Sequence, residues 1–152
     1  MTLSDAAFAA SILVVDDKPA NLRLLSQLLS ERGYHVRPVL SGTQALAAAQ
    51  AMPPDLILLD IRMPDINGYE ISRRLKDDPR TRAIPILFIS ALHDTEDKIK
   101  AFAAGGVDYI TKPFHFDEVL ARVQTQLTLQ QLRRNLEQEI AEGRFRDDLY
   151  FR

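Results

Sequence analysis

The stretch Ile12-Leu13-Val14-Val15-Asp16-Asp17 is an uninterrupted apolar run that ends abruptly in two aspartates. Comparable runs occur at residues 56–59, which are followed by Asp60, and at residues 86–89, which are followed by Ser90. Strands that are apolar on both sides are typical of a parallel sheet whose two faces are covered by helices. These three stretches therefore predict buried central strands.

Helical patterns separate the apolar runs. Leucines recur at helical spacing after the first run, and Gly33 then supplies a stop. We predict a second strand over residues 35–39, a helix capped by Ser41, and a fifth strand over residues 107–110. The helix capped by Ser41 carries apolar residues at Ala45, Leu46, Ala49 and Met52. The next two predicted helices carry theirs at Ile71 and Leu75, and at Ile99, Phe102 and Ala103. Five strands alternating with five helices predict a doubly wound α/β fold with right-handed crossovers.

Composition limits the class of protein. The chain has 152 residues, of which 46% are hydrophobic and 26% charged, and its formal net charge is -2. This charge argues against direct nucleic-acid binding. The absence of cysteine excludes disulfide scaffolds, zinc–thiolate sites and thiol catalysis. The start of the chain does not read as a signal peptide, and no apolar stretch approaches the ~20 residues that cross a bilayer. We therefore expect a cytoplasmic protein without membrane contact.

The last part of the chain predicts a helix that is too long for the domain. We divide the chain into an N-terminal tail (residues 1–11), a domain (residues 12–126) and a helical or coiled-coil extension with its tail (residues 127–152). The helix carries an apolar stripe at Val119, Val123, Leu127, Leu129, Leu132, Leu136 and Ile140. Because a single exposed helix is marginal in water, the stripe predicts a homodimer, and an ordinary fraying terminal helix is the alternative. We expect the charged tail from Glu142 to be poorly ordered.

Polar residues stand where the predicted strands end. Asp16 and Asp17 end the first strand, Asp60 the third and Ser90 the fourth, and Lys112 follows the fifth. In an open parallel sheet these ends meet at one edge, where ligands bind. Three carboxylates raise one another's pKa, and Mg²⁺ removes this cost because it prefers carboxylates, waters and a phosphate. A lysine and a hydroxyl beside the acids suit phosphoryl transfer onto an aspartate.

Each of these residues also has an ordinary structural interpretation. Asp16 or Asp17 alone is a plausible cap for the helix that begins near Pro19. Ser90 fits a turn, and Lys112 fits a solvated surface. The chain has no phosphate-binding P-loop and no dinucleotide fingerprint, so nucleotide binding is not indicated.

Two further functions remain at this point. One is a Mg²⁺-dependent phosphohydrolase with Asp60 as its nucleophile, which needs an acid where this chain has Arg62 and a cap over its substrate. The other is an interaction module whose acids only bind metal.

The motifs resemble the receiver domain of two-component response regulators over roughly residues 12–126. The residues that carry this resemblance are Val14-Val15-Asp16-Asp17, Leu58-Leu59-Asp60-Ile61-Arg62-Met63-Pro64-Asp65 with Gly68, Ile89-Ser90-Ala91, and Asp108-Tyr109-Ile110-Thr111-Lys112-Pro113-Phe114. The resemblance implies a flavodoxin-like (βα)5 sheet of strand order 2-1-3-4-5 with an extended C-terminal helix.

The resemblance also implies roles for the residues at the sheet edge. Asp60 accepts a phosphoryl group from a sensor histidine kinase or a histidine phosphotransfer protein. Asp16, Asp17, Asp60 and the backbone carbonyl of Arg62 hold the Mg²⁺ cofactor.

The same resemblance implies a set of switch and phosphoryl-binding residues. These are Ser90, Ala91, Tyr109 and Lys112, and a cis peptide bond precedes Pro113. Phosphorylation is expected to repack the face made by the fourth helix, fifth strand and fifth helix, and with it the C-terminal helix. Such a chain is a signalling switch and not an enzyme, since it catalyses only its own phosphorylation and dephosphorylation.

Overall fold

The computed structural model describes residues 9–91 and 95–150, and the side chains within them as far as residue 143. Strands and helices alternate along this part of the chain. The strands are β1 (Ser11–Val15), β2 (His35–Val39), β3 (Leu56–Leu59), β4 (Ile86–Ser90) and β5 (Asp108–Thr111). The helices are α2 (Pro19–Glu31), α3 (Gly42–Ala51), α4 (Gly68–Asp77), α5 (Thr95–Ala103) and α6 (Phe116–Tyr150). Residues 1–8 of the expected N-terminal tail lie outside the described residues.

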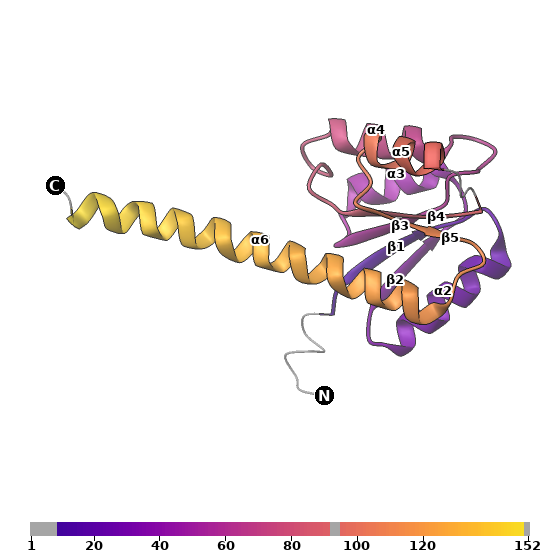
Figure 1. Cartoon of the computed structure of the whole chain (residues 1–152), viewed down its shortest axis with the longest axis horizontal. Coiled ribbons are helices and arrows are strands. Elements are labelled where there is room, and N and C mark those ends of the chain that lie inside the picture. The colour runs from indigo at the N-terminus through magenta and orange to yellow at the C-terminus, as the bar shows by residue number, and fades with distance from the viewer. Residues whose placement is uncertain (1–8, 92–94, 151–152) are drawn as a thin grey trace.

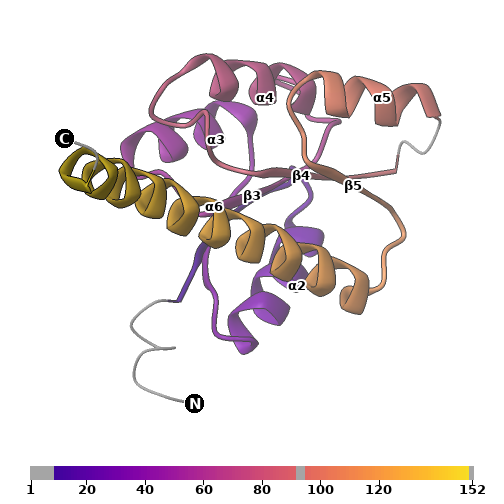
Figure 2. The ribbon, with the colours of Figure 1, turned by 60° about the vertical axis from the view of Figure 1, so that its left-hand side comes forward.

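The strands form one parallel sheet in the order β2-β1-β3-β4-β5. The predicted strand order is therefore confirmed. Helices α3, α4 and α5 cover one face of the sheet, and α2 with the first half of α6 covers the other (Figures 1 and 2). Because both faces are covered, the central strands are apolar throughout, as the runs in the sequence predicted.

Alternate residues of each central strand enter different cores. Leu13 and Val15 of β1 pack on the side of α3 and α4, whereas Ile12 and Val14 pack on the side of α2 and α6. This alternation is the ordinary period of a strand, with an apolar layer at both positions. The ends of the strands are therefore held rigidly where the polar residues follow.

Side chains cap two of the helices. Ser41 Oγ accepts a hydrogen bond from Gln44 N at 3.2 Å, which confirms the predicted cap of α3. Asn67 Oδ1 accepts one from Glu70 N at 3.0 Å at the start of α4. The prediction that Met52 lies on the apolar face of α3 is wrong, because the helix ends at Ala51 ahead of two prolines and Met52 is exposed.

Helix α5 turns a different face to the sheet than predicted. Ile99 and Phe102 were predicted to form its apolar face, but both are exposed, and the small Ala101 is buried instead. Phe88 and Gly106 approach each other closely beside Ala101, since a Cβ on Gly106 would lie 2.5 Å from the Phe88 ring. The large Phe88 ring therefore fills the volume under α5, and two apolar side chains of α5 remain on the surface.

Helix α6 extends far beyond the domain (Figure 1). It has 35 residues, which corresponds to about 52 Å at 1.5 Å per residue. The tail from Glu142, expected to be poorly ordered, continues the helix to Tyr150; residues 142–150 contain no proline that would end it. Residues 151 and 152 lie outside the described part. None of the described helices is long and apolar enough to span a membrane.

Gly68 allows α4 to begin directly against the end of β3. A Cβ at this position would lie 2.5 Å from the Asp60 carbonyl oxygen and 2.8 Å from Ile61 Cα. We expect Gly68→Ala to lower the free energy of unfolding by about 1–3 kcal/mol, because backbone must move to admit the methyl group. Chemical denaturation monitored by circular dichroism measures this change.

Gly143→Ala is the matched control, because a Cβ there meets nothing within 4 Å and the residue lies inside α6. That variant should be unchanged or more stable by up to about 1 kcal/mol. Equal stability of the two variants and the parent would contradict the close approach at Gly68.

Candidate functional site

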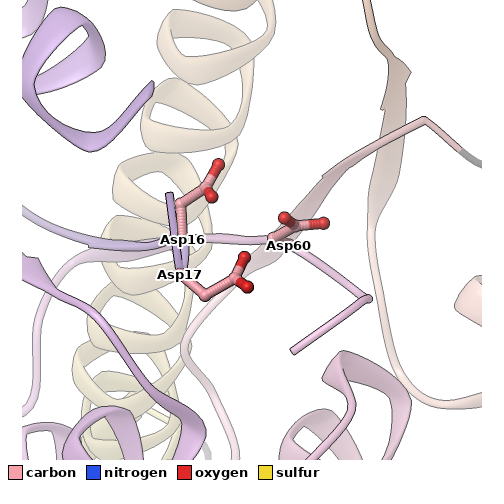
Figure 3. A group of neighbouring side chains, drawn as sticks. All are labelled: Asp16, Asp17 and Asp60. Carbon is pink, nitrogen blue, oxygen red and sulfur yellow. The ribbon is translucent and has the colours of Figure 1, made fainter. Parts of the chain in front are cut away.

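The structure brings the predicted acids together at the carboxyl edge of the sheet. Asp16 and Asp17 follow β1, and Asp60 follows β3, the neighbouring strand. One carboxylate oxygen from each of the three residues lies within 4.8 Å of the others (Figure 3). Adjacent parallel strands place their ends at one edge, so strands far apart in sequence deliver these side chains to one point.

Lys112 joins two of the acids from the loop after β5. Its Nζ donates hydrogen bonds to Asp16 Oδ2 at 3.0 Å and to Asp60 Oδ2 at 3.2 Å. The Lys112 side chain is only 14% exposed, and those of Asp16 and Asp60 are less exposed still. Its backbone N–H donates to the Ser90 carbonyl at 2.8 Å, and the Lys112–Pro113 peptide bond is cis. The ammonium is thus held firmly between the two carboxylates.

Burial and charge act against each other on the ionisable groups. Burial raises the pKa of Asp60, the ammonium of Lys112 lowers it, and the carboxylate of Asp16 raises it, with a net increase. Burial alone would lower the pKa of Lys112, but its hydrogen bond with Asp16 and the charge of Asp60 outweigh this effect and raise it. One lysine therefore compensates the acids incompletely, and the site favours a further positive charge.

Asp16 and Asp17 have different surroundings. Asp16 Oδ1 accepts a hydrogen bond from Lys18 N at 2.9 Å just before α2, while its other oxygen contacts Lys112. No side chain of the described residues caps α2, whose N-cap residue is Lys18, so the capping interpretation of Asp16 and Asp17 is wrong. Asp17 Oδ1 is buried and has no hydrogen-bond partner among the described residues. A buried carboxylate oxygen without a donor beside two other carboxylates fits a hard cation such as Mg²⁺.

Ser90 and Tyr109 lie next to the acids on β4 and β5. Both are buried, and Tyr109 is only 7% exposed, with its ring centre 6.5 Å from that of Phe88. Burial, together with the neighbouring Tyr69, raises the pKa of Tyr109 to about 12, although a hydrogen bond with Ser90 acts to lower it. Ala91 follows Ser90 and is exposed. The Tyr109 ring therefore occupies the interior in this structure.

Arg62 lies at the rim of the site. Its side chain is exposed and borders a surface cavity of about 450 Å³ together with Asp17, Met63 and Tyr69. Arg62, two positions after Asp60, thus places a positive charge beside the cavity next to the acids.

Two residues near the site were given no role in the sequence analysis. Tyr69 on α4 donates a hydrogen bond from its hydroxyl to the Asp97 carbonyl of α5 at 3.1 Å, and its ring centre lies 5.8 Å from that of Phe88. Tyr69, Phe88 and Tyr109 therefore form a row of aromatic rings from α4 to β5. A tyrosine at the start of an amphipathic helix gives no local signal of this contact.

Asp65 is the second such residue, in the loop after β3. Its carboxylate accepts hydrogen bonds from Thr43 N at 2.9 Å, Thr43 Oγ1 at 2.8 Å and Gly42 N at 3.2 Å. These bonds hold the pKa of Asp65 below its usual range. They tie the loop that follows Asp60 to the amino end of α3, a contact between residues that are 22 positions apart.

Comparison with known proteins agrees with this fold and site. Residues 12–124 match the response regulator receiver domain family. The chain is 43% identical over 116 residues to the DNA-binding dual master transcriptional regulator RpaA of Synechocystis, covering 76% of this chain and 48% of that protein. It is 42% identical over 136 residues to the response regulator PleD of Caulobacter vibrioides, covering 90% of this chain and 30% of that protein.

Solved structures agree with the sequence relatives. A CheY-like response regulator receiver domain protein from Methanospirillum hungatei superposes with a TM-score of 0.78 at 26% identity, covering 82% of this chain and 98% of that chain. Fold and site together define an α/β domain of the receiver type. The chain belongs to the response regulator receiver domain family. It spans less than half the length of the two curated relatives above.

Removal of the Lys112 charge tests the electrostatics of the site. We expect Lys112→Met to lower the free energy of unfolding by roughly 2–4 kcal/mol without divalent cations, because two buried carboxylates lose their compensating charge. Added Mg²⁺ should restore more stability to this variant than to the parent. Urea denaturation with and without Mg²⁺ measures both effects.

Arg80→Met is the control, since Arg80 is 63% exposed and pairs with Asp78 on the surface. Its stability should change by less than about 1 kcal/mol. If Mg²⁺ stabilised Lys112→Met no more than Arg80→Met, the three carboxylates would not act as a cation-dependent cluster.

Proposed function

We propose that the chain is the phosphoacceptor of a two-component system and that Asp60 takes a phosphoryl group from a histidine kinase or a histidine phosphotransfer protein. The observation that carries this proposal is the contact of Lys112 Nζ with Asp60 at 3.2 Å inside a cluster of three carboxylates. An oxygen of Asp60 forms the new O–P bond while the N–P bond to the donor histidine breaks. The imidazole leaves with the electron pair of that bond and takes up a proton.

The side chains of Asp16, Asp17 and Asp60, with the carbonyl of Arg62, are the proposed Mg²⁺ ligands. The bound cation would neutralise negative charge on the incoming phosphoryl oxygens. Lys112 supplies a second, permanent positive charge at the same carboxylates. Ser90, buried at the end of β4, supplies a hydroxyl donor, and the exposed Ala91 lies beside it. The Arg62 side chain stands where a phosphohydrolase would need its acid, so this alternative lacks support.

The signal is a change of packing that begins at Ser90 and Tyr109. A phosphoryl group on Asp60 adds charge and acceptor oxygens, and the Ser90 hydroxyl, which is hydrogen-bonded with Tyr109 in this structure, then donates to one of them. Phosphorylation thereby shifts the population of packings at the face made by α5, β5 and α6. The exposed Ile99 and Phe102 of α5 provide apolar surface on this face.

The second part of the proposal is a homodimer formed through α6. Leu129, Leu132, Leu136 and Ile140 are 50–57% exposed along one side of the helix. Apolar side chains at this spacing suit pairing with a second copy of the helix. In this proposal, residues 12–126 form the receiver and residues 127–152 the pairing extension. A cytoplasmic location and an output that does not include direct DNA contact by this chain belong to the same proposal.

Phosphoryl uptake by Asp60 is the first test. The chain is incubated with Mg²⁺ and acetyl phosphate, and its intact mass is measured beside that of Asp60→Asn. We expect one added phosphoryl group on the parent and none on the variant, because an amide cannot serve as the acceptor. The same assay with a phosphorylated histidine phosphotransfer protein tests transfer from a protein donor.

Lys112→Met serves as the matched variant in this assay, because it retains Asp60 and removes only the cation. It should take up the phosphoryl group more slowly than the parent. Uptake at the parental rate by Asp60→Asn would place the acceptor elsewhere, and no uptake from either donor would favour a domain that only binds metal.

The oligomeric state tests the role of the α6 stripe. We expect Leu132→Lys with Leu136→Lys to abolish self-association, because charged side chains then face each other in the paired helices. Sedimentation velocity with and without acetyl phosphate measures this change. Gln131→Lys with Asn135→Lys is the control, since these exposed residues lie off the stripe and hydrogen-bond each other at 3.0 Å. An unchanged oligomeric state in both conditions would remove the dimer from the proposal.

A further inference from the structure

One polar side chain of α6 is buried where the rest of the helix is exposed. Gln130 is only 9% exposed, whereas residues 128–142 are otherwise exposed to solvent. Leu127, one turn earlier on α6, packs partly against the core between the sheet, α2 and α6. A buried amide at this position needs hydrogen-bond partners, because an unpaired one costs free energy. Its partners show what holds this part of the helix.

Gln130 is bound by Asp55, the residue before β3. With the Gln130 amide assigned in the orientation that satisfies both of its polar atoms, Nε2 donates to the Asp55 carbonyl at 2.8 Å and Oε1 accepts from Arg134 Nη2 at 3.2 Å. Arg134 also lies 3.7 Å from Asp55 Oδ1. The other carboxylate oxygen of Asp55 accepts from Ser11 N at 2.7 Å at the start of β1. Asp55 thus joins two strands and two residues of α6.

This contact lies at the opposite end of the sheet from the acids. Asp55 and Ser11 stand at the amino ends of β3 and β1, and the carboxyl ends of the same strands lead into Asp60 and Asp16. Helix α6 is therefore held at two places: by Val119 and Val123 in the core, and again by Asp55 at the far edge of the sheet. A helix fixed at two places cannot rotate about its axis without breaking one of them.

The two sides of α6 have different surroundings at this point. At 3.6 residues per turn, Leu132 and Leu136 lie roughly 160° around the helix from Arg134. The leucine stripe consequently points away from the contact with Asp55, in agreement with its exposure. Arg133 lies on a third side of the helix. Burial lowers the pKa of Lys76, and the positive charge of Arg133 lowers it further. Arg133 therefore faces the like charge of Lys76, whereas Arg134 faces the opposite charge of Asp55.

We propose that Asp55, Gln130 and Arg134 form a latch that sets the direction and rotation of α6 relative to the receiver. The latch makes the first turns of the extension one rigid body with the sheet and presents the leucine stripe outward. A shift at the α5, β5 and α6 face must then move the helix as a whole or open the latch. The latch depends on the proposed function in one respect only: the stripe of Leu129, Leu132, Leu136 and Ile140 that it turns outward is the one proposed to pair with a second copy.

The test measures amide hydrogen exchange along α6 by mass spectrometry. All variants carry Leu132→Lys and Leu136→Lys as well, so that helix pairing does not contribute protection. We expect Gln130→Ala and Arg134→Ala to raise exchange of residues 128–138 roughly fivefold, as for the loss of one net hydrogen bond. Arg134→Lys should give an intermediate increase, since it keeps the charge and loses the forked geometry. Peptides from β3 and β4 should exchange at the parental rate.

Gln131→Ala and Arg133→Ala are the neighbouring controls. Each makes the same chemical change one residue away, so any effect of alanine on helix propensity is shared. The controls should leave exchange of residues 128–138 unchanged. If the latch variants exchanged no faster than these controls, the latch would be refuted. A chain that fails to dimerise would contradict the pairing through α6 and leave this comparison fully interpretable.

Discussion

The ammonium of Lys112 contacts both Asp16 and Asp60, and the organisation of the domain follows from the cost of keeping these like charges together. Carboxylates on neighbouring strands repel one another, and burial makes that repulsion stronger. Lys112 offsets part of this repulsion from the loop after β5, where its backbone N–H donates a hydrogen bond to the Ser90 carbonyl. Burial, the largest effect, and the carboxylate of Asp16 raise the pKa of Asp60 despite the ammonium of Lys112. The remaining demand for positive charge makes the site receptive to a metal ion.

The proposed switch requires a connection from the edge of the sheet to the surface. Central strands buried on both faces cannot move independently, so change is confined to loops and to the side chains beside them. Tyr69, Phe88 and Tyr109 form such a set, since their rings run from α4 across β4 to β5 and the Tyr69 hydroxyl holds α5. In the proposed switch, a repacking at Tyr109 would therefore reach α5 through contacts that already exist. The first member of this aromatic row is Tyr69, whose ring contacts Phe88.

The sequence predicted those features that depend on local pattern. Apolar runs ending in Asp16, Asp60 and Ser90 indicated both the sheet and the edge where polar groups gather, because strand direction follows from the alternation with helices. Prediction from the sequence failed where a contact depends on residues that are distant in the chain. Nothing near Asp65 indicates that it binds the start of α3, and nothing near Asp55 indicates that it binds α6.

The error at α5 has a related cause. Ile99 and Phe102 are apolar at helical spacing, and such residues usually face a core. Here the buried residue of α5 is the small Ala101, which shares its core with the large Phe88 ring. Periodicity reports which residues share a face of a helix, and the neighbouring strand decides which face is buried. The two exposed apolar side chains are therefore informative, because they mark surface that the fold itself does not cover.

Helix α6 shows how far intramolecular contacts can stabilise an extension. Core packing holds its first half, and the contacts of Gln130 and Arg134 with Asp55 add about one more turn. Past Arg134 the described side chains, as far as residue 143, have only contacts within the helix, such as the hydrogen bond between Gln138 and Glu142. Pairs of this kind stabilise a helix by tenths of a kcal/mol, about 0.2–0.5 each, too little to order a long segment alone. Leu136 and Ile140 lie on this same segment and are exposed, so in the proposed dimer the part of α6 that the domain supports least would gain most from a second helix.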